Sequence, residues 1–99
     1  MRLTPQQATI IRDTARAVFG ADARVWLFGS RVDDTRRGGD IDLLLQTATL
    51  PPEDAFLRKV RFIGKLHDAL GEQKIDVVIE QPGDTRGIVR IAHQTGVTL

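Results

Sequence analysis

The chain has 99 residues, with 14 Lys and Arg against 13 Asp and Glu, so its formal net charge is only +1. This length fits a single domain over residues 1–99, and a nearly neutral chain argues against extensive direct binding of nucleic acid. The absence of cysteine excludes disulfides, thiolate metal sites and a cysteine nucleophile, and two histidines are too few for a three-histidine metal site.

The N-terminal residues predict a helix that is preceded by no targeting signal. Residues 1–5 lack the apolar core of a signal peptide, and no apolar run is long enough to span a membrane, so we expect a cytoplasmic protein. Thr4 followed by Pro5 is typical of a helix start, and Gly20 of a helix end, which predicts a helix over 5–19. The apolar run 25–28, which includes Trp26, predicts a strand whose tryptophan packs in the core.

The second half of the chain alternates between strand and helix patterns. Strands are predicted at 40–46 and 75–80, and Val97–Leu99 is expected to add a short edge strand. A helix that ends at Gly71 is expected between the first two, and another over 85–95. The apolar positions that we expect to define their inner faces are Phe56, Val60, Ile63, His67 and Leu70 in the first helix, and Ile88, Ile91 and Ala92 in the second.

This order of elements predicts an α/β (α+β) fold, a small mixed sheet of three to four strands flanked by helices. A helix joins the strands at 40–46 and 75–80, which indicates a parallel pair. The connection between the strands at 25–28 and 40–46 is compatible with either a long hairpin or a short crossover.

Three aspartates stand at strand positions, where aspartate is a poor residue. Asp40 and Asp42 share one face of their strand because successive side chains alternate, and Asp76 stands opposite the apolar face of the next strand. If these two strands pair in register, Asp76 comes near the other two. Carboxylates gathered in this way repel one another unless a cation neutralises them, and Mg²⁺ prefers such oxygen ligands. The alternative for each aspartate is a solvated residue at a strand end.

A Gly-Ser pair follows the first strand. Gly29 permits a close approach of the backbone to a phosphate, and Ser30 adds a hydroxyl donor. Alone, this pair is more typical of a turn with a helix cap. Its value here is that a strand precedes it and Asp-x-Asp follows it.

The segments Leu27–Arg31 and Gly39–Leu43 together resemble the signature of the DNA polymerase beta-like nucleotidyltransferase superfamily. The short chain is similar to the minimal nucleotidyltransferases (MNT) within it. The resemblance implies the nucleotidyltransferase fold, with Asp40, Asp42 and Asp76 as catalytic residues and as ligands of Mg²⁺, two ions being expected. It also implies that Gly29, Ser30 and Arg31 bind the nucleotide.

The same resemblance implies a metal-dependent enzyme that moves a nucleoside monophosphate, AMP from ATP, to a hydroxyl on a partner protein. Minimal nucleotidyltransferases are one half of HEPN/MNT toxin–antitoxin systems, so the implied role is an antitoxin that adenylylates a tyrosine of a HEPN ribonuclease toxin in a hetero-oligomer. Two alternatives stay open. One is a non-catalytic antitoxin that caps its HEPN partner, and the other is a nucleotidyltransferase for a small molecule of the aminoglycoside type.

Overall fold

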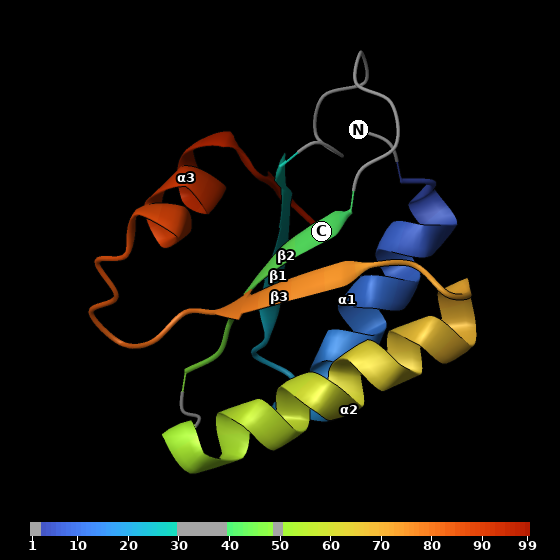
Figure 1. Cartoon of the computed structure of the whole chain (residues 1–99), viewed down its shortest axis with the longest axis horizontal. Coiled ribbons are helices and arrows are strands. Elements are labelled where there is room, and N and C mark those ends of the chain that lie inside the picture. The colour runs from blue at the N-terminus through green and yellow to red at the C-terminus, as the bar shows by residue number, and fades with distance from the viewer. Residues whose placement is uncertain (1–2, 30–39, 49–50) are drawn as a thin grey trace.

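The computed structural model describes residues 3–29, 40–48 and 51–99, and the elements in these ranges follow the predicted order. Three helices and a four-stranded mixed sheet are present in this part of the chain, which confirms the α/β class (Figure 1). The elements are α1 (Pro5–Phe19), β1 (Arg24–Phe28), β2 (Ile41–Gln46), α2 (Pro52–Leu70), β3 (Ile75–Ile79), α3 (Gly87–Thr95) and β4 (Val97–Thr98).

The strand order in the sheet is β3-β2-β1-β4. Strands β2 and β3 are parallel, as the intervening helix predicted. Strands β1 and β2 are antiparallel, so the connection that the sequence left open is of the hairpin type. The predicted C-terminal edge strand is present as β4, which is antiparallel to β1.

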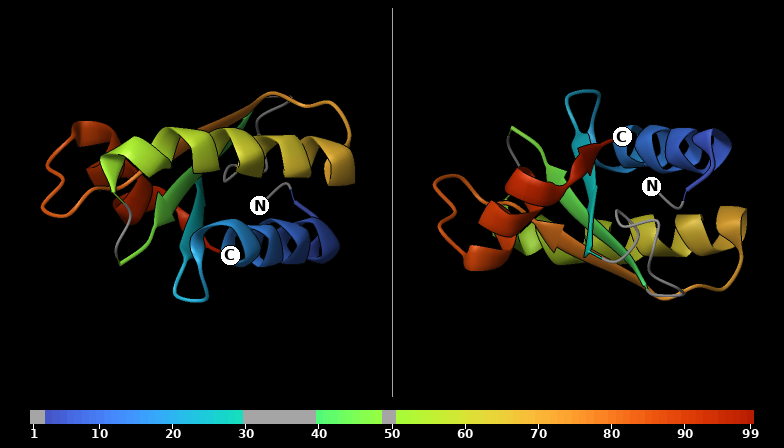
Figure 2. Two further views of the ribbon diagram at one scale, coloured as in Figure 1. Left: turned by 90° about the horizontal axis from the view of Figure 1, so that it is seen from below. Right: turned by 90° about the horizontal axis from the view of Figure 1, so that it is seen from above.

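Helices cover both faces of the sheet (Figure 2). Helices α1 and α2 pack on one face, against inward side chains such as Leu27 and Leu43, while α3 packs on the other face with Val89 and Ala92. Trp26 belongs to this second, smaller cluster and is buried, as predicted. None of the helices in the described ranges is long and apolar enough to cross a membrane.

The start of α1 shows how local sequence determines an element. The Thr4 hydroxyl accepts a hydrogen bond from the Gln7 backbone N–H, and the Gln7 side chain accepts one from the Thr4 N–H, each at 3.0 Å. This reciprocal pair, followed by proline in the first turn, satisfies amide groups that a helix start would otherwise leave unpaired. The predicted boundaries of this helix are confirmed.

The inner faces of the two later helices agree with the prediction only in part. In α2 the fully buried side chains are Phe62 and Leu66, while Phe56 and Val60 are 69% and 54% exposed. Ile63 and Leu70 of the expected stripe do pack against the core, so the buried face overlaps the prediction on one side and extends to Phe62 and Leu66 on the other. In α3, Ala92 is buried as predicted, whereas Ile88 and Ile91 lie outward and Val89 completes the inner face. Packing selects these faces: the Phe62 ring meets Phe19 of α1 edge-on at 5.5 Å.

Candidate active site

Two of the predicted aspartates are direct neighbours across the parallel pair of strands. Asp42 of β2 is the register partner of Asp76 of β3. Ile41 and Leu43 are buried in the core under α1 and α2, so Asp42 points to the opposite face of the sheet. Asp40 lies directly before β2, two residues from Asp42. The arrangement that strand alternation predicted for Asp42 and Asp76 is therefore present.

Asp42 has the most unusual electrostatic environment of the three. Its register partner on the other side is the buried Phe28 of β1. Asp42 therefore lies between an aromatic residue on β1 and a second acidic residue on β3. Partial burial raises the pKa of Asp42 above its ordinary value of 3.8, and the charges of Asp76 and Asp40 raise it further. Lys74 acts in the opposite direction. A bound cation would relieve both the burial cost and the repulsion.

Lys74 is a site neighbour that sequence reasoning missed. Its Nζ lies 3.4 Å from Oδ2 of Asp40, and its carbonyl oxygen accepts a hydrogen bond from the Ile41 N–H at 3.0 Å. The register, which the sequence does not provide, explains this contact: Ile41 pairs with Ile75, so the residues that precede these two strands also face each other. The charge of this lysine partly balances the acidic charge of the carboxylates.

Gly29 directly follows β1 and has a conformation that favours glycine, with φ at +76°. A Cβ atom at this position would overlap the Asp42 carboxylate. The absence of a side chain therefore lets the chain pass close to Asp42, at the place where the sequence predicted nucleotide binding. The other two predicted nucleotide-binding residues, Ser30 and Arg31, lie outside the described residues.

The carboxylates fit a hard divalent cation in their chemistry, since Asp42 and Asp76 offer oxygen donors from adjacent strands. As they stand, however, no three side chains of Asp, Glu or His within residues 3–29, 40–48 and 51–99 meet closely enough to hold one metal ion. Metal binding by Asp40, Asp42 and Asp76 therefore stays a prediction.

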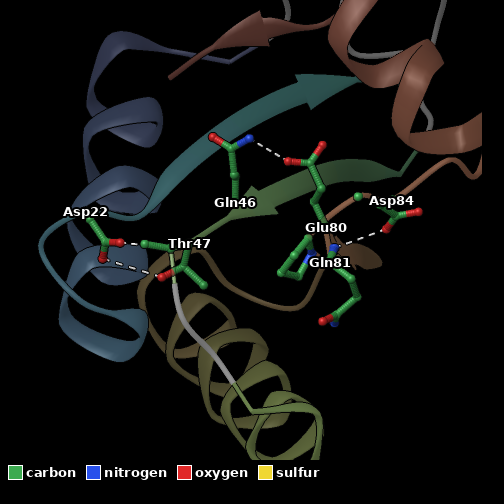
Figure 3. A pocket seen from close by; sticks show the side chains of 9 residues that line it. Asp22, Gln46, Thr47, Glu80, Gln81 and Asp84 are labelled. Atoms are coloured by element: carbon green, nitrogen blue, oxygen red, sulfur yellow. Dashed lines mark hydrogen bonds between the residues drawn. The ribbon is translucent and has the colours of Figure 1, made fainter.

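A hollow of about 590 Å³ lies elsewhere, beside the far ends of β2 and β3, and it carries three further acids (Figure 3). Each of these acids already has partners. Asp22 accepts a hydrogen bond from the Ala48 N–H at 2.8 Å, Glu80 pairs with His93 and with the Gln46 amide, and Asp84 pairs with Arg86. These contacts tie turns and strand ends together, so the hollow is a structural feature rather than a second acidic site.

Comparison with known proteins agrees with the geometry. A family model described as a nucleotidyltransferase domain matches residues 9–97, which includes all three aspartates and Gly29. Members of this family generally use a divalent metal ion and a nucleoside triphosphate, and the domain implies a transferase of the EC 2.7.7 type. A search of curated proteins found no match.

Proposed function

Because the chain belongs to the nucleotidyltransferase domain family, we propose that it transfers AMP from ATP to a hydroxyl group of a partner protein. The observation that carries this proposal is the register pairing of Asp42 with Asp76 beside Gly29. Two carboxylates held together on adjacent strands, one with a raised pKa, are costly to keep without a cation. A site of this kind is suited to metal-assisted phosphoryl chemistry.

Each residue has a definite role in this proposal. Asp40, Asp42 and Asp76 hold Mg²⁺, which supplies charge neutralisation at the triphosphate when bound. Asp76 also takes the proton of the acceptor hydroxyl as its oxygen bonds to the α-phosphorus and the bond to pyrophosphate breaks. Gly29, Ser30 and Arg31 bind the phosphates.

The acceptor is proposed to be a HEPN-domain toxin in the cytoplasm, modified on a tyrosine, which makes this chain its antitoxin. Support comes from the resemblance to minimal nucleotidyltransferases and from the openness of the site. Asp76 is exposed and Asp42 is half-buried, so the described residues leave room for an acceptor from another chain. A hetero-oligomer with the toxin would bring that acceptor to the carboxylates.

The test is transfer of label from α-labelled ATP with Mg²⁺ in a lysate of the host. Wild-type protein is compared with the double variant Asp40→Asn/Asp42→Asn and with Asp13→Asn, which changes an exposed acid on α1. We expect a labelled protein band with the wild type and with Asp13→Asn, and none with the double variant. Mass spectrometry of the band then identifies the acceptor and the modified residue.

Other outcomes redirect the proposal. If the double variant labelled the acceptor as strongly as the wild type does, Asp40 and Asp42 would have no role in the transfer. No labelling by any form, together with toxin neutralisation by the double variant in cells, would favour an antitoxin that acts by capping. Labelling of a small hydroxylated compound in place of a protein would indicate a small-molecule enzyme.

A further inference from the structure

The outward side of α2 carries a group of exposed apolar side chains. Phe56 and Leu57 are 69% and 68% exposed, the two largest values among the large hydrophobic residues that the structure describes, and Val60 is 54% exposed. They lie close to one another along the helix, on the side away from the buried Phe62. Single exposed apolar residues are ordinary, but three neighbours on one helix are typical of a contact surface.

The positions around this group suit the close approach of another helix. With 3.6 residues per turn, Glu53, Leu57, Val60 and Gly64 lie along one outward line of α2. Gly64 has no side chain, and a Cβ placed there would meet nothing within 4 Å. The left view of Figure 2 shows α2 running along the outside of the molecule, and Leu57 and Val60 on this line are exposed.

Charges of opposite sign flank the apolar group. Glu53 lies before it and Arg61 lies at its C-terminal side, and both side chains are exposed. Neither makes a hydrogen bond or an ion pair with any residue in the described part of the chain. An identical helix laid antiparallel across Leu57 would bring its own Arg61 to Glu53 and its own Glu53 to Arg61.

We infer that this surface is the interface of a homodimer, in which the α2 helices of two copies pack antiparallel around Leu57 and Val60. A two-fold interface must be complementary to itself. The order Glu53, Leu57, Arg61 is self-complementary only when the two helices are antiparallel, because each acid then faces a base. A parallel arrangement would place like charges together. The charge order therefore favours a second copy of the chain over an unrelated partner.

This dimer would leave the candidate active sites free. Helix α2 covers one face of the sheet, whereas Asp42 and Asp76 lie on the face that carries α3. Both copies would therefore present their carboxylates to nucleotide and acceptor at the same time. The proposed dimer can be tested independently of the proposed activity, because its test is a measurement of mass alone.

The first experiment is sedimentation equilibrium of the purified chain over a wide range of concentrations. We expect reversible association to twice the chain mass of 11.0 kDa. Val60→Asp should raise the dissociation constant by about tenfold or more, because it buries a charge at the interface centre. Ile91→Asp is the matched control, since Ile91 on α3 is also 54% exposed, and it should leave association unchanged.

A charge exchange tests the antiparallel register. Glu53→Arg and Arg61→Glu should each weaken the dimer, and the double variant Glu53→Arg/Arg61→Glu should restore wild-type association. Circular dichroism of each variant shows that α2 is still folded. A monomer at every concentration, equal effects of Val60→Asp and Ile91→Asp, or no recovery in the double exchange would each overturn the inference.

Discussion

At the scale of single residues, the candidate site depends on how closely two chain segments approach. Gly29 has a positive φ, and the space that a side chain would fill there is taken by the carboxylate of Asp42. Any other residue would face two penalties, one from the backbone and one from the overlap. These two penalties can be separated, because the chain contains a second glycine that has only the first.

We predict that Gly29→Ala destabilises the protein more than Gly71→Ala does. Gly71 has a similar φ of +85°, but a Cβ there would meet nothing within 4 Å. Gly71 combines this φ with a ψ of 177°, a conformation that is essentially restricted to glycine. Gly71→Ala should therefore cost about 1–3 kcal/mol from the backbone alone, and Gly29→Ala should cost about 1–3 kcal/mol more through the clash. Urea denaturation of both variants measures the difference, and equal losses would mean that the overlap is relieved at little cost.

The aspartates were predictable and their lysine neighbour was not. Two rules suffice for Asp42 and Asp76: side chains alternate along a strand, and a helix between two strands favours a parallel pair. The contact of Lys74 with Asp40 depends on the exact register, which a sequence pattern does not provide. Register also decides which carboxylates meet, so the sequence indicated the cluster but not its spacing.

At the scale of elements, helix boundaries were easier to predict than helix faces. Thr4, Pro5 and Gly20 mark the ends of α1 through local chemistry that acts within a few residues. The inner face of α2 depends on distant partners. Because this helix has apolar side chains on most sides, among them Leu57 and Phe62, its periodicity fits more than one orientation, and contact with α1 selects one.

The turn between β3 and α3 is held by an electrostatic interaction between Asp84 and Arg86 that can be tested. Hydrogen bonds from the Arg86 side chain, and then from the backbone N–H groups of Gln81 and Arg86, hold the pKa of Asp84 well below its ordinary value of 3.8. Arg86 also donates to the Ile79 carbonyl at 2.8 Å, so the pair connects the end of β3 to the start of α3. A pKa lowered by folding stabilises the protein above the unfolded value, and this contribution is lost as the pH falls.

We therefore predict that Asp84→Asn lowers the free energy of unfolding at neutral pH. The deficit relative to wild type should shrink as the pH falls below 3.8, because the carboxylate of the unfolded wild-type chain then becomes protonated while the folded one still resists protonation. Asp13→Asn is the control, because Asp13 has only an exposed contact with Arg12 at 3.4 Å, and it should change stability little. Urea denaturation at several pH values measures both, and a deficit that is independent of pH would rule out the charge as its source.

At the scale of the whole molecule, the two faces of the sheet differ in what they carry. The face under α1 and α2 holds the larger apolar core, and the other face carries a smaller cluster under α3 beside the half-buried Asp42. Stability is thus built mainly on one face, while the other keeps a repulsive group of acids. We therefore expect the site residues to reduce stability and a bound ligand to restore it.

This division predicts that Asp42→Asn makes the metal-free protein more stable at neutral pH. The folded pKa of Asp42 is raised, so its contribution is favourable below the unfolded value of 3.8 and is lost as the pH rises through the folded value. The gain from the variant should be less than about 1 kcal/mol, because solvent screens the charges at this half-exposed position. It should disappear at about pH 3, where the wild-type carboxylate is protonated in both states.

Mg²⁺ with ATP should reverse the order of stability. Ligand that binds only the folded state at ten times its dissociation constant adds about 1.4 kcal/mol, which exceeds the gain from removing the charge. Thermal unfolding with and without Mg²⁺ and ATP should therefore show a higher midpoint for the wild type and no shift for Asp42→Asn. If the variant were less stable than the wild type without ligand, or if both gained equally from it, Asp42 would be a structural carboxylate and the link between its repulsion and metal binding would fail.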